Sequence, residues 1–504
     1  MPNALYDALF EQHRGSSRPY IFKPDGTSIT YSDFLAMAAR TAHALRSFGV
    51  EPGDRVAVQI AKSPEALALY IASVQAGAIF LPLNTAYTPS EIEYFVENAG
   101  PKLLVCDPAS VDALAPIAAV AGAELKTLAS DGSGSLTELA KDQSTTFPTV
   151  DRGPDDLAAF LYTSGTTGRS KGAMLTHDNL LSNAVSLVDA WRFTEDDILL
   201  HALPIFHTHG LFVAANTMTL AGGAMIWLPG FQIDAVIENL PRATSMMGVP
   251  TFYTRLLDDP RFTQDLVSHI RLFTSGSAPL LAETHVAFEE RTGHRILERY
   301  GMTETNMNTS NPYDGERRAG TVGFPLPGVS LRICDLETTK ELRHGDIGVI
   351  EVKGPNVFKG YWRMPEKTKE EFRDDGFFIT GDLARIDEDG YVHIVGRAKD
   401  LIISGGYNIY PKEVELLLDE QQGVLESAVI GVPHPDFGEA VIAAVVPQKG
   451  AAVEEADILE AIHDKIARFK QPKRIHIVSE LPRNTMGKVQ KNLLRDQFGK
   501  DFSA

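Results

Sequence analysis

The sequence predicts an α/β fold: a large N-terminal domain of layered α/β subdomains plus a β-rich subdomain, and a small, mobile α+β C-terminal domain. Short apolar runs alternate with amphipathic stretches through the first two-thirds of the chain, which is typical of layered α/β structure. Residues 331–361 are richer in β-branched residues and turn glycines, and the last hundred residues carry a pattern of their own. With 504 residues, the chain is long enough for two or three packed units.

The first clear elements alternate between strand and helix. Short apolar runs predict buried strands, and an Ala/Leu-rich run between the first two predicts a helix. The expected order is strand 55–60, helix 64–76, strand 78–83 and, after a further helix, strand 103–106.

That further helix is marked by its first residues. Thr88 is suited to the N-cap, Pro89 to the first helical position, and Glu91 completes a capping box. The helix is expected to end at Gly100. One apolar face should point into the core, formed by Ile92, Phe95, Val96 and Ala99.

The C-terminal hundred residues predict strands 426–432, 441–447 and 474–478 and a helix over 457–467. Before them, the polar run Gly396 to Asp400 lacks the hydrophobic periodicity of either neighbour, as linkers do. We therefore expect an N-terminal domain over 1–396, a hinge at 397–399 and a C-terminal lid domain over 400–504.

Composition excludes several classes of partner. A formal charge of -19 argues against a surface for nucleic acid or anionic membranes. No run approaches the roughly 18 apolar residues of a membrane span, and the first residues do not form a secretory signal. The two cysteines, Cys106 and Cys334, are too few for a disulfide framework. We expect a cytoplasmic protein that binds neither nucleic acid nor membrane.

The strongest functional signal follows the apolar run 157–161. Three glycines, five hydroxyls and two cations lie within ten residues, and such residues bring main-chain N–H groups, side-chain donors and charge to phosphate oxygens. A Walker A loop is excluded because Lys171 follows Ser170 and precedes Gly172. A flexible Ser/Gly linker is the alternative, but linkers seldom place cations directly after a buried strand. The predicted ATP cradle comprises Thr163, Ser164, Gly165, Thr166, Thr167, Gly168 and Lys171.

This segment resembles the phosphate loop of the acyl-adenylate-forming superfamily of acyl-CoA synthetases, luciferases and peptide-synthetase adenylation domains. The remaining core motifs of that superfamily are matched, in order, by residues 300–304, 380–382, 396–400 and 482–488. The resemblance implies an ATP-dependent acid:CoA ligase that forms an acyl-adenylate and then a thioester. ATP, Mg²⁺ and coenzyme A are the implied cofactors and substrates.

The resemblance also implies roles for the motif residues around the nucleotide. Tyr300 should stack on adenine, Thr303 should bond the α-phosphate, and Glu304 should hold Mg²⁺, a hard cation suited to carboxylate and phosphate oxygens. Asp382 should bind the ribose hydroxyls, and Arg397 should reach the ribose and phosphate. The adenine pocket should be lined by Gly276, Ser277 and Ala278. Taken singly, Tyr300 also fits a core aromatic, and Asp382 and Arg397 fit a surface salt bridge.

Other implied roles concern the reacting groups. His207 should border the reacting carboxylate, although it also fits a packed core histidine. Lys488 should neutralise charge that builds on pyrophosphate, which makes it the first candidate for catalysis, with His207 and Thr303 beside it. The C-terminal domain should rotate about Lys399 between the two half-reactions. This rotation would bring a pantetheine tunnel loop to the site, namely Ser404, Gly405, Gly406 and Tyr407.

The residue before the Tyr300 motif indicates which carboxylic acid is the substrate. Most relatives have a small residue there, whereas this chain has Arg299, which is costly to bury unless the substrate carries a second negative charge. Arg255 is a second candidate for that carboxylate. The string around Arg299 resembles malonyl-CoA and methylmalonyl-CoA synthetases, so we expect a dicarboxylate substrate. Two alternatives stay open at this point: Arg299 pairs with Glu298, and Arg255 lies on a helix surface.

Further expectations are less specific. Thr208 and Met307 flank recognised motifs and should limit pocket size. Removal of the charge of Lys488 by acetylation would disable adenylation, which makes a lysine acetyltransferase and a deacetylase candidate partners. The rival functions are a ligase for an aromatic or medium-chain monocarboxylate, a peptide-synthetase adenylation domain, and a nucleotide-binding regulatory protein without catalysis. Four basic residues form a cluster that either binds the CoA nucleotide or is simply a charged, solvent-exposed surface: Arg468, Lys470, Lys473 and Arg474.

Overall fold

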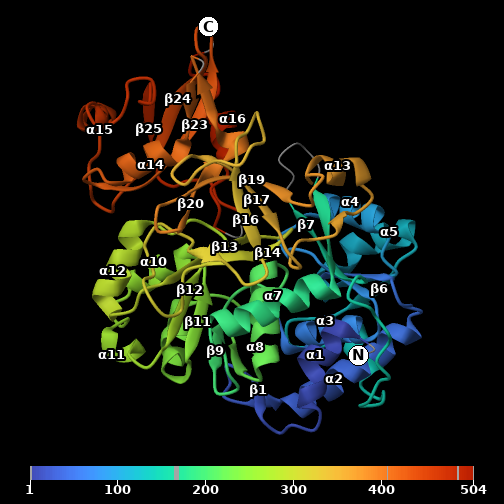
Figure 1. Ribbon diagram of the computed structural model, residues 1–504. Coiled ribbons are helices and arrows are strands. Elements are labelled where there is room, and N and C mark those ends of the chain that lie inside the picture. Colours follow the sequence, from blue (N-terminus) through green and yellow to red (C-terminus); the bar gives the residue numbers. More distant parts are fainter. Residues whose placement is uncertain (1–2, 164–169, 406, 485–486, 503–504) are drawn as a thin grey trace. The chain divides into compact units, whose positions relative to one another are not determined.

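The chain forms two compact units, seen in a computed structural model that describes residues 3–163, 170–405, 407–484 and 487–502 (Figure 1). Unit 1 comprises Met1–Ser330 and Val352–Phe378, and unit 2 comprises Leu331–Glu351 and Ile379–Ala504. The β-rich segment expected after the α/β layers therefore contributes mostly to unit 2. The hinge at 397–399 stays a prediction.

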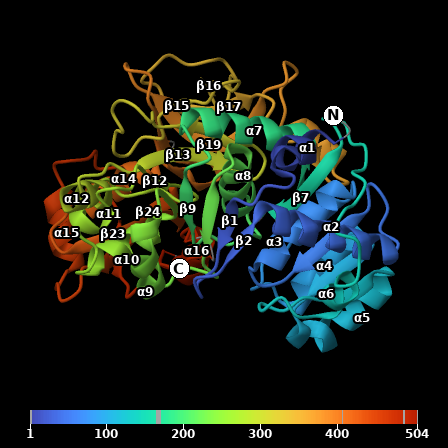
Figure 2. The ribbon, with the colours of Figure 1, turned by 90° about the horizontal axis from the view of Figure 1, so that it is seen from below.

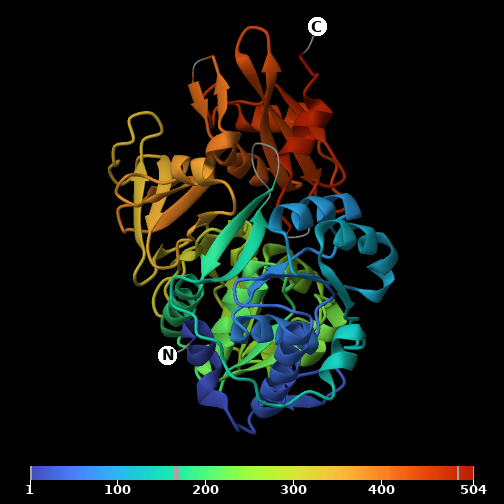
Figure 3. The same ribbon diagram turned by 90° about the vertical axis from the view of Figure 1, so that its right-hand side faces the viewer.

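A seven-stranded sheet of unit 1 has the order β18-β8-β7-β4-β3-β5-β6. Its central strands run parallel and are buried as apolar runs, whereas β8 and β18 are antiparallel additions at one edge. Its strands are β3 (Arg55–Gln59), β4 (Ile79–Pro82), β5 (Leu103–Cys106), β6 (Glu124–Thr127), β7 (Leu157–Thr163), β8 (Lys171–Thr176) and β18 (Gly360–Tyr361). In Figure 3 the teal strands β7 and β8 form a long hairpin.

Helices connect these strands as expected for βαβ units. They are α3 (Pro64–Gln75), α4 (Pro89–Ala99), α5 (Val111–Ala121) and α6 (Ser135–Ala140), and α2 (Tyr31–Ser47) precedes β3; all five are seen in blue to teal in Figure 2. The capping box of α4 is confirmed: the Thr88 side chain accepts from the Glu91 amide, and Gly100 ends the helix at a φ of 57°. Its predicted apolar face is buried.

A nine-stranded sheet completes the core of unit 1, in the order β15-β14-β13-β12-β11-β9-β10-β1-β2. Strands from β1 to β13 in this order pair in parallel, and the three edge strands β2, β14 and β15 are antiparallel. The strands are β1 (Pro19–Phe22), β2 (Ser28–Thr30), β9 (Ile198–His201), β10 (Ala224–Trp227), β11 (Ser245–Gly248), β12 (Leu272–Ser275), β13 (Leu297–Met302), β14 (Asn306–Ser310) and β15 (Phe324–Pro325).

The helices of this part include one unpredicted element. A π-helix, η3 (His209–Asn216), directly follows the Phe-His-Thr segment, and π-helical turns are frequent at functional sites. The α-helices are α1 (Ala4–Phe10), α7 (His177–Ala190), α8 (Thr217–Ala221), α9 (Ile233–Asn239), α10 (Pro250–Asp258), α11 (Gln264–Val267), α12 (Ala282–Thr292) and α13 (Pro365–Glu370).

Unit 2 is a smaller α+β structure with two sheets. One has the order β16-β17-β19-β20, and the other has β22-β21-β24-β23 with β25 added to β24. The strands are β16 (Ser330–Cys334), β17 (Gly348–Lys353), β19 (Phe378–Ile386), β20 (Val392–Arg397), β21 (Ile402–Ser404), β22 (Tyr407–Ile409), β23 (Val424–His434), β24 (Gly438–Pro447) and β25 (Arg474–Ile477). The helices are α14 (Pro411–Asp419), α15 (Glu455–Ile462) and α16 (Lys491–Phe498). The predicted α/β fold class with a small C-terminal α+β part is confirmed.

One element of unit 2 is shorter than predicted. The helix expected over 457–467 already ends at Ile462 in α15. The Gln471 amide donates to the carbonyls of His463 (2.6 Å) and Ile466 (3.1 Å), so a distant side chain satisfies groups that another helical turn would have used. Across the described ranges, we find no helix with the length and apolar character needed to traverse a bilayer.

Candidate active site

The predicted ATP cradle is bounded by two paired strands of unit 1. Thr163 ends β7 and Lys171 begins β8, and these two residues are partners in the antiparallel ladder. The Thr163 hydroxyl also donates to the Lys171 carbonyl at 3.4 Å. The hairpin therefore fixes both ends of the cradle. Five of its predicted members lie outside the described residues: Ser164, Gly165, Thr166, Thr167 and Gly168.

A hydrogen-bonded network joins the cradle lysine to the predicted metal carboxylate. The Lys171 ammonium lies 2.8 Å from Glu371 Oε1 and 4.1 Å from the centroid of the Tyr361 ring. The Tyr361 hydroxyl lies 2.6 Å from Glu371 Oε2 and 3.1 Å from Glu304 Oε1. Tyr361 and Glu371 were not predicted from the sequence, since they stand about two hundred residues from Lys171 and belong to no local motif that we recognised.

The charges of this network are set by burial and hydrogen bonding. Burial opposes ionisation of Glu371, but hydrogen bonds from Lys171 and Tyr361 outweigh it and lower its pKa. Burial, reinforced by Glu304 and Glu371, raises the pKa of Tyr361 far above its usual value. The hydroxyl therefore stays protonated, and its single proton can be donated to either of the two carboxylates.

Substitution of Tyr361 by Phe is expected to lower the free energy of unfolding by about 2 kcal/mol, because the donor to the ionised Glu371 and to the buried Glu304 is lost. Urea denaturation of the two proteins measures the change. Tyr87→Phe is a matched control, since Tyr87 is a half-buried tyrosine of the same unit whose hydroxyl makes no hydrogen bond to another described residue. Equal stability losses in the two variants would contradict the network.

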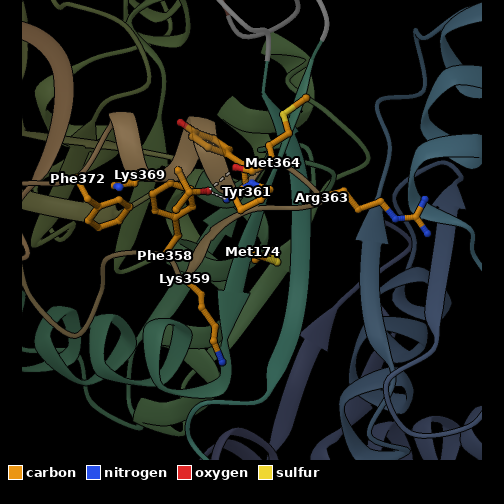
Figure 4. Close-up of a pocket in the computed structure, with 10 residues that line it drawn as sticks. Met174, Phe358, Lys359, Tyr361, Arg363, Met364, Lys369 and Phe372 are labelled. Carbon is orange, nitrogen blue, oxygen red and sulfur yellow. Dashed lines mark hydrogen bonds between the residues drawn. The ribbon is translucent and has the colours of Figure 1, made fainter.

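A pocket of about 550 Å³ lies beside Tyr361 (Figure 4). Phe358 and Phe372 form an aromatic wall next to Tyr361, and Met174 and Lys359 line it as well. Of the described lining residues, none is a predicted site residue. The pocket therefore adjoins the Glu304 network through Tyr361 and does not itself contain the predicted chemistry.

The Tyr300 motif comprises the last three residues of β13 and the first two residues of the turn that leads into β14. A side chain at Gly301 would place its Cβ 1.8 Å from the Asn306 carbonyl oxygen, so only glycine permits this close strand approach. Tyr300 and Thr303 are half-buried, and Glu304 is only 5% exposed. The turn therefore brings the residues with predicted adenine, phosphate and metal roles together on one short segment.

The predicted adenine segment Gly276–Ala278 lies against this strand. It directly follows β12, whose last residue Ser275 pairs with Glu298 of β13. Ser277 has a φ of 68°, an uncommon backbone conformation for a residue with a side chain. A Cβ at Gly276 would meet Arg299 Nη1 at 2.2 Å, so the guanidinium packs directly on the glycine backbone.

Arg299 is buried without an acidic partner. It is 4% exposed, and no carboxylate of the described chain pairs with it. Its Nε and Nη2 atoms have no hydrogen-bond acceptor among the described residues. Burial lowers its pKa to about 9, so the guanidinium remains charged at neutral pH.

The alternative that Arg299 pairs with Glu298 is wrong. Glu298 points to the other face of β13, where its Oε1 lies 3.2 Å from His285 Nδ1 and 3.3 Å from the Gly320 amide. Consecutive strand residues face opposite sides of a sheet, which keeps the two side chains apart.

Three residues of the Phe-His-Thr-His segment also reach this region. The Thr208 hydroxyl donates to Asn306 at 2.7 Å, which places it beside the buried Met307. His207 Nδ1 accepts from the His209 amide at 3.3 Å. His209 was not predicted: it is 1% exposed, its Nδ1 lies 3.2 Å from Ser277 Oγ, and burial followed by the charge of Arg299 lowers its pKa. The signal available in the sequence was a second histidine two residues after His207.

Arg255 does not join this group. It lies on the exposed face of α10, with its guanidinium carbon 6.0 Å from the centroid of the Phe231 ring. None of the described contacts links it to Arg299. Its predicted role in carboxylate binding gains no support from this placement and stays a prediction.

Two predicted ribose ligands of unit 2 are direct partners. Asp382 of β19 pairs with Arg397 of β20 in the ladder, and Arg397 Nε lies 2.5 Å from Asp382 Oδ1. Asp382 is only 3% exposed. Asp382 and Arg397 therefore form the salt bridge that was the alternative to nucleotide binding. The same two residues remain the predicted ligands of the ribose and phosphate.

The other predicted residues of unit 2 lie in short turns. Lys399 belongs to the turn after β20, and burial lowers its pKa. Gly405 lies at the tip of the β21–β22 hairpin with a φ of 58°, between Ser404 and the exposed Tyr407, which stacks on Phe469. Gly406 lies outside the described residues. Lys488 is exposed, and its backbone pairs with Asn484.

The basic cluster is partly neutralised. Lys470 binds both carboxylate oxygens of Glu413 at 2.6 and 2.8 Å, and Arg474 lies 3.9 Å from Asp501. Such pairing favours the solvated-charge interpretation of these two residues over a CoA-nucleotide site.

Comparison with known proteins gives a consistent family match. The profile described as AMP-binding enzyme matches residues 10–362, and the profile of the AMP-binding enzyme C-terminal domain matches residues 413–488. A crystal structure of ATP-bound MatB from Rhodopseudomonas palustris is 60% identical, covers 100% of both chains and superposes with a TM-score of 0.98.

Two curated relatives name different acids. A malonate–CoA ligase of Arabidopsis thaliana is 34% identical over 97% of this chain and 88% of its own length. A feruloyl-CoA synthase of an Amycolatopsis species is 37% identical over 94% of this chain and 95% of its own length. Identity to these two relatives shows the family but does not identify the acid that this chain activates. The choice of acid depends on the residues of the acyl pocket.

Proposed function

Because the chain belongs to the AMP-binding enzyme family and is an AMP-forming acid–thiol ligase, we propose that it converts malonate to malonyl-CoA, with methylmalonate as a second substrate. The observation that carries the proposal is Arg299, a buried guanidinium without an acidic partner in the described chain. A substrate with a second carboxylate would supply that partner in paired hydrogen bonds. The similarity to MatB and to a malonate–CoA ligase supports the same choice.

The reaction has two displacement steps. In the first, an oxygen of one malonate carboxylate bonds the α-phosphorus of ATP, the bond to pyrophosphate breaks, and malonyl-AMP remains. In the second, the sulfur of CoA bonds the acyl carbon, the bond to AMP breaks, and the thiol proton passes to solvent. The mixed anhydride conserves the energy of ATP for thioester formation.

The residues of unit 1 are proposed to bind and orient the nucleotide and the acid. Thr163, Lys171 and the loop between them hold the phosphates, Tyr300 stacks on adenine between the strand ends, and Thr303 donates to the α-phosphate. His207 borders the reacting carboxylate. Tyr361 and Glu371 then hold Lys171 and Glu304 in place, which extends the site beyond the motifs.

Glu304 is proposed to hold Mg²⁺, and its surroundings fit that ion. The described residues contain no group of three or more histidines, cysteines, aspartates or glutamates placed to hold a metal. Mg²⁺ does not need such a cage, since it is commonly bound by one or two carboxylates and phosphate oxygens. When bound, the ion neutralises phosphate charge.

Unit 2 is proposed to complete each half-reaction in turn. Asp382 and Arg397 bind the ribose and phosphate, and Lys488 serves adenylation. Rotation about Lys399 then exchanges Lys488 for the hairpin that contains Ser404, Gly405, Gly406 and Tyr407, which lines the route of CoA. Gly405 suits a narrow passage because it has no side chain, and its φ of 58° is one that other residues rarely adopt.

The alternative is a ligase for an aromatic or medium-chain monocarboxylate, which the feruloyl-CoA synthase match favours. An apolar acyl group of that kind would leave the Arg299 guanidinium buried and unpaired, which is costly. Arg299 therefore favours the dicarboxylate.

A panel of mono- and dicarboxylates, assayed for release of pyrophosphate and AMP with ATP, Mg²⁺ and CoA, tests the proposal. Malonate and methylmalonate are expected to exceed propionate, ferulate and octanoate in kcat/KM by roughly ten-thousandfold, the scale at which a site built for polar contacts rejects analogues that lack them. A monocarboxylate as the best substrate would overturn the malonate assignment and leave the ligase chemistry intact.

A further inference from the structure

The backbone around Lys488 is bonded within its own segment, which we call the Lys488 segment (residues 483–484 and 487–489). Arg483 and Val489 form an isolated antiparallel bridge. The Asn484 amide donates to the Lys488 carbonyl at 3.0 Å, and the Lys488 amide donates to Asn484 Oδ1 at 3.0 Å. These bonds set the local shape of the segment, but they do not by themselves fix its orientation on unit 2.

The Arg483 side chain attaches the segment to a strand. Its Nη1 atom donates to the Gly487 carbonyl at 2.6 Å, and its Nη2 atom forms an ion pair with Glu426 of β23. The Gly487 carbonyl belongs to the peptide bond that leads directly into Lys488. One planar guanidinium therefore joins this peptide bond to β23.

The strand that carries Glu426 is firmly held in unit 2. It pairs with β24 along its length, and buried side chains of both strands form a core with Leu481 and Leu494, which stand on either side of the segment in the sequence. After the segment, Lys491 Nζ lies 2.5 Å from Glu415 Oε1. The chain is thus anchored before and after the segment, and Arg483 adds a contact from the segment itself.

The Arg483–Glu426 pair is better suited to fixing a position than to stabilising the fold. The two side chains are 30% and 22% exposed, and ion pairs between partly exposed side chains contribute little to the free energy of unfolding. A guanidinium still restricts geometry, because its donors lie in one fixed plane.

We propose that Arg483 is a positioning residue for adenylation, which together with Glu426 clamps the peptide bond before Lys488 to β23. This inference rests on the proposed role of Lys488. Stabilisation of the charge on pyrophosphate requires an ammonium that is already in position, whereas a lysine on a loosely held segment would have to be ordered in each turnover. The second half-reaction does not use Lys488 and should not need the clamp.

Three variants test the clamp: Arg483→Met, Glu426→Gln and the double variant. Both half-reactions are measured with the acid of the panel that releases pyrophosphate fastest. Each single substitution is expected to lower the rate of pyrophosphate release roughly tenfold, the scale of a lost hydrogen bond to a charged group. Thioester formation from the supplied acyl-AMP and CoA should stay within about twofold of wild type. The double variant should be no slower than the slower single variant, because the two residues act as one unit.

The matched control is Lys412→Met. Lys412 is a half-buried lysine of α14 whose Nζ lies 4.0 Å from Asp419, so this variant also removes a paired positive charge of unit 2 without touching the Lys488 segment. Its rate of pyrophosphate release should stay within about twofold of wild type. A tenfold loss in this control would show that charge alone matters and would overturn the clamp.

The other outcomes also decide. Unchanged pyrophosphate release in both single variants, equal losses in the two half-reactions, or losses that multiply in the double variant would each overturn the clamp. Should Arg483→Met lack cooperative unfolding, Arg483→Lys decides: a loss confined to adenylation supports the clamp, and an unchanged rate overturns it. An acid other than malonate as the best substrate would overturn the malonate assignment alone, since the clamp is measured with whichever acid reacts fastest.

Discussion

Lys488→Ala is expected to lower the rate of pyrophosphate release by roughly a hundredfold to a thousandfold, the effect of removing one preorganised electrostatic group. Negative charge builds on pyrophosphate as the carboxylate approaches the α-phosphorus, and an exposed lysine on a short turn is suited to neutralise it. Thioester formation from supplied malonyl-AMP and CoA should continue at close to the wild-type rate. The two half-reactions are measured separately, the first by pyrophosphate release and the second by malonyl-CoA formation.

The matched control is Lys449→Ala, which removes another exposed lysine of unit 2. It should leave both half-reactions within about twofold of wild type, because substitutions at such surface positions usually have small effects. Equal loss of both half-reactions in Lys488→Ala would show that the lysine supports the protein generally, and the assignment to adenylation would then be discarded.

Acetylation of Lys488 is predicted to have the same effect as the alanine substitution. The acetyl group removes the positive charge while leaving the backbone pairing with Asn484 available. Protein carrying acetyl-lysine at this position, assayed for pyrophosphate release before and after a deacetylase, measures the effect. An acetylated form with full adenylation activity would contradict this regulatory proposal.

Arg299→Met is expected to reduce kcat/KM for malonate by roughly thirtyfold or more, equivalent to about 2 kcal/mol, because the distal carboxylate would lose its charged partner. The free energy of unfolding should stay unchanged or rise, since a buried guanidinium without an acidic partner in the described chain gives way to an apolar side chain of similar length. A residue with a purely structural role would show the opposite pattern, a loss of stability with unchanged selectivity.

Arg299→Lys provides the conservative comparison. It keeps the charge but loses the planar, two-pronged donor arrangement, so its kcat/KM for malonate should lie between those of the wild type and Arg299→Met. Unchanged preference for malonate over propionate in both variants would discard Arg299 as the selectivity residue.

Local sequence was sufficient wherever a few neighbouring residues decide the structure. The α4 helix was predicted with its N-cap, capping box, apolar face and glycine stop, because each of these features depends on contacts within one or two helical turns. The strand before the phosphate loop was recognisable for a similar reason: β7 is buried and pairs in parallel with β4, and such strands are continuous apolar runs.

Long-range packing decided what local patterns left open. The rejection of the Glu298–Arg299 pair required knowledge of which face of β13 each side chain occupies, and the partner of Glu298 is a histidine from α12. Residues 331–351 belong to unit 2 because they contact strands beyond residue 378. Neighbouring residues in the sequence give no signal of these contacts.

The sequence by itself determined the fold class, the family and the order of the catalytic motifs, since apolar periodicity and contiguous phosphate-binding residues are local properties of the chain. Only the tertiary structure decided that Arg299 is buried against Gly276, that His209 lies beside it, and that Tyr361 links Lys171 to Glu304 through Glu371. The physical reason is that burial and hydrogen bonding depend on which distant segments meet. The free energy of a charged side chain is then set by those neighbours and by its removal from water.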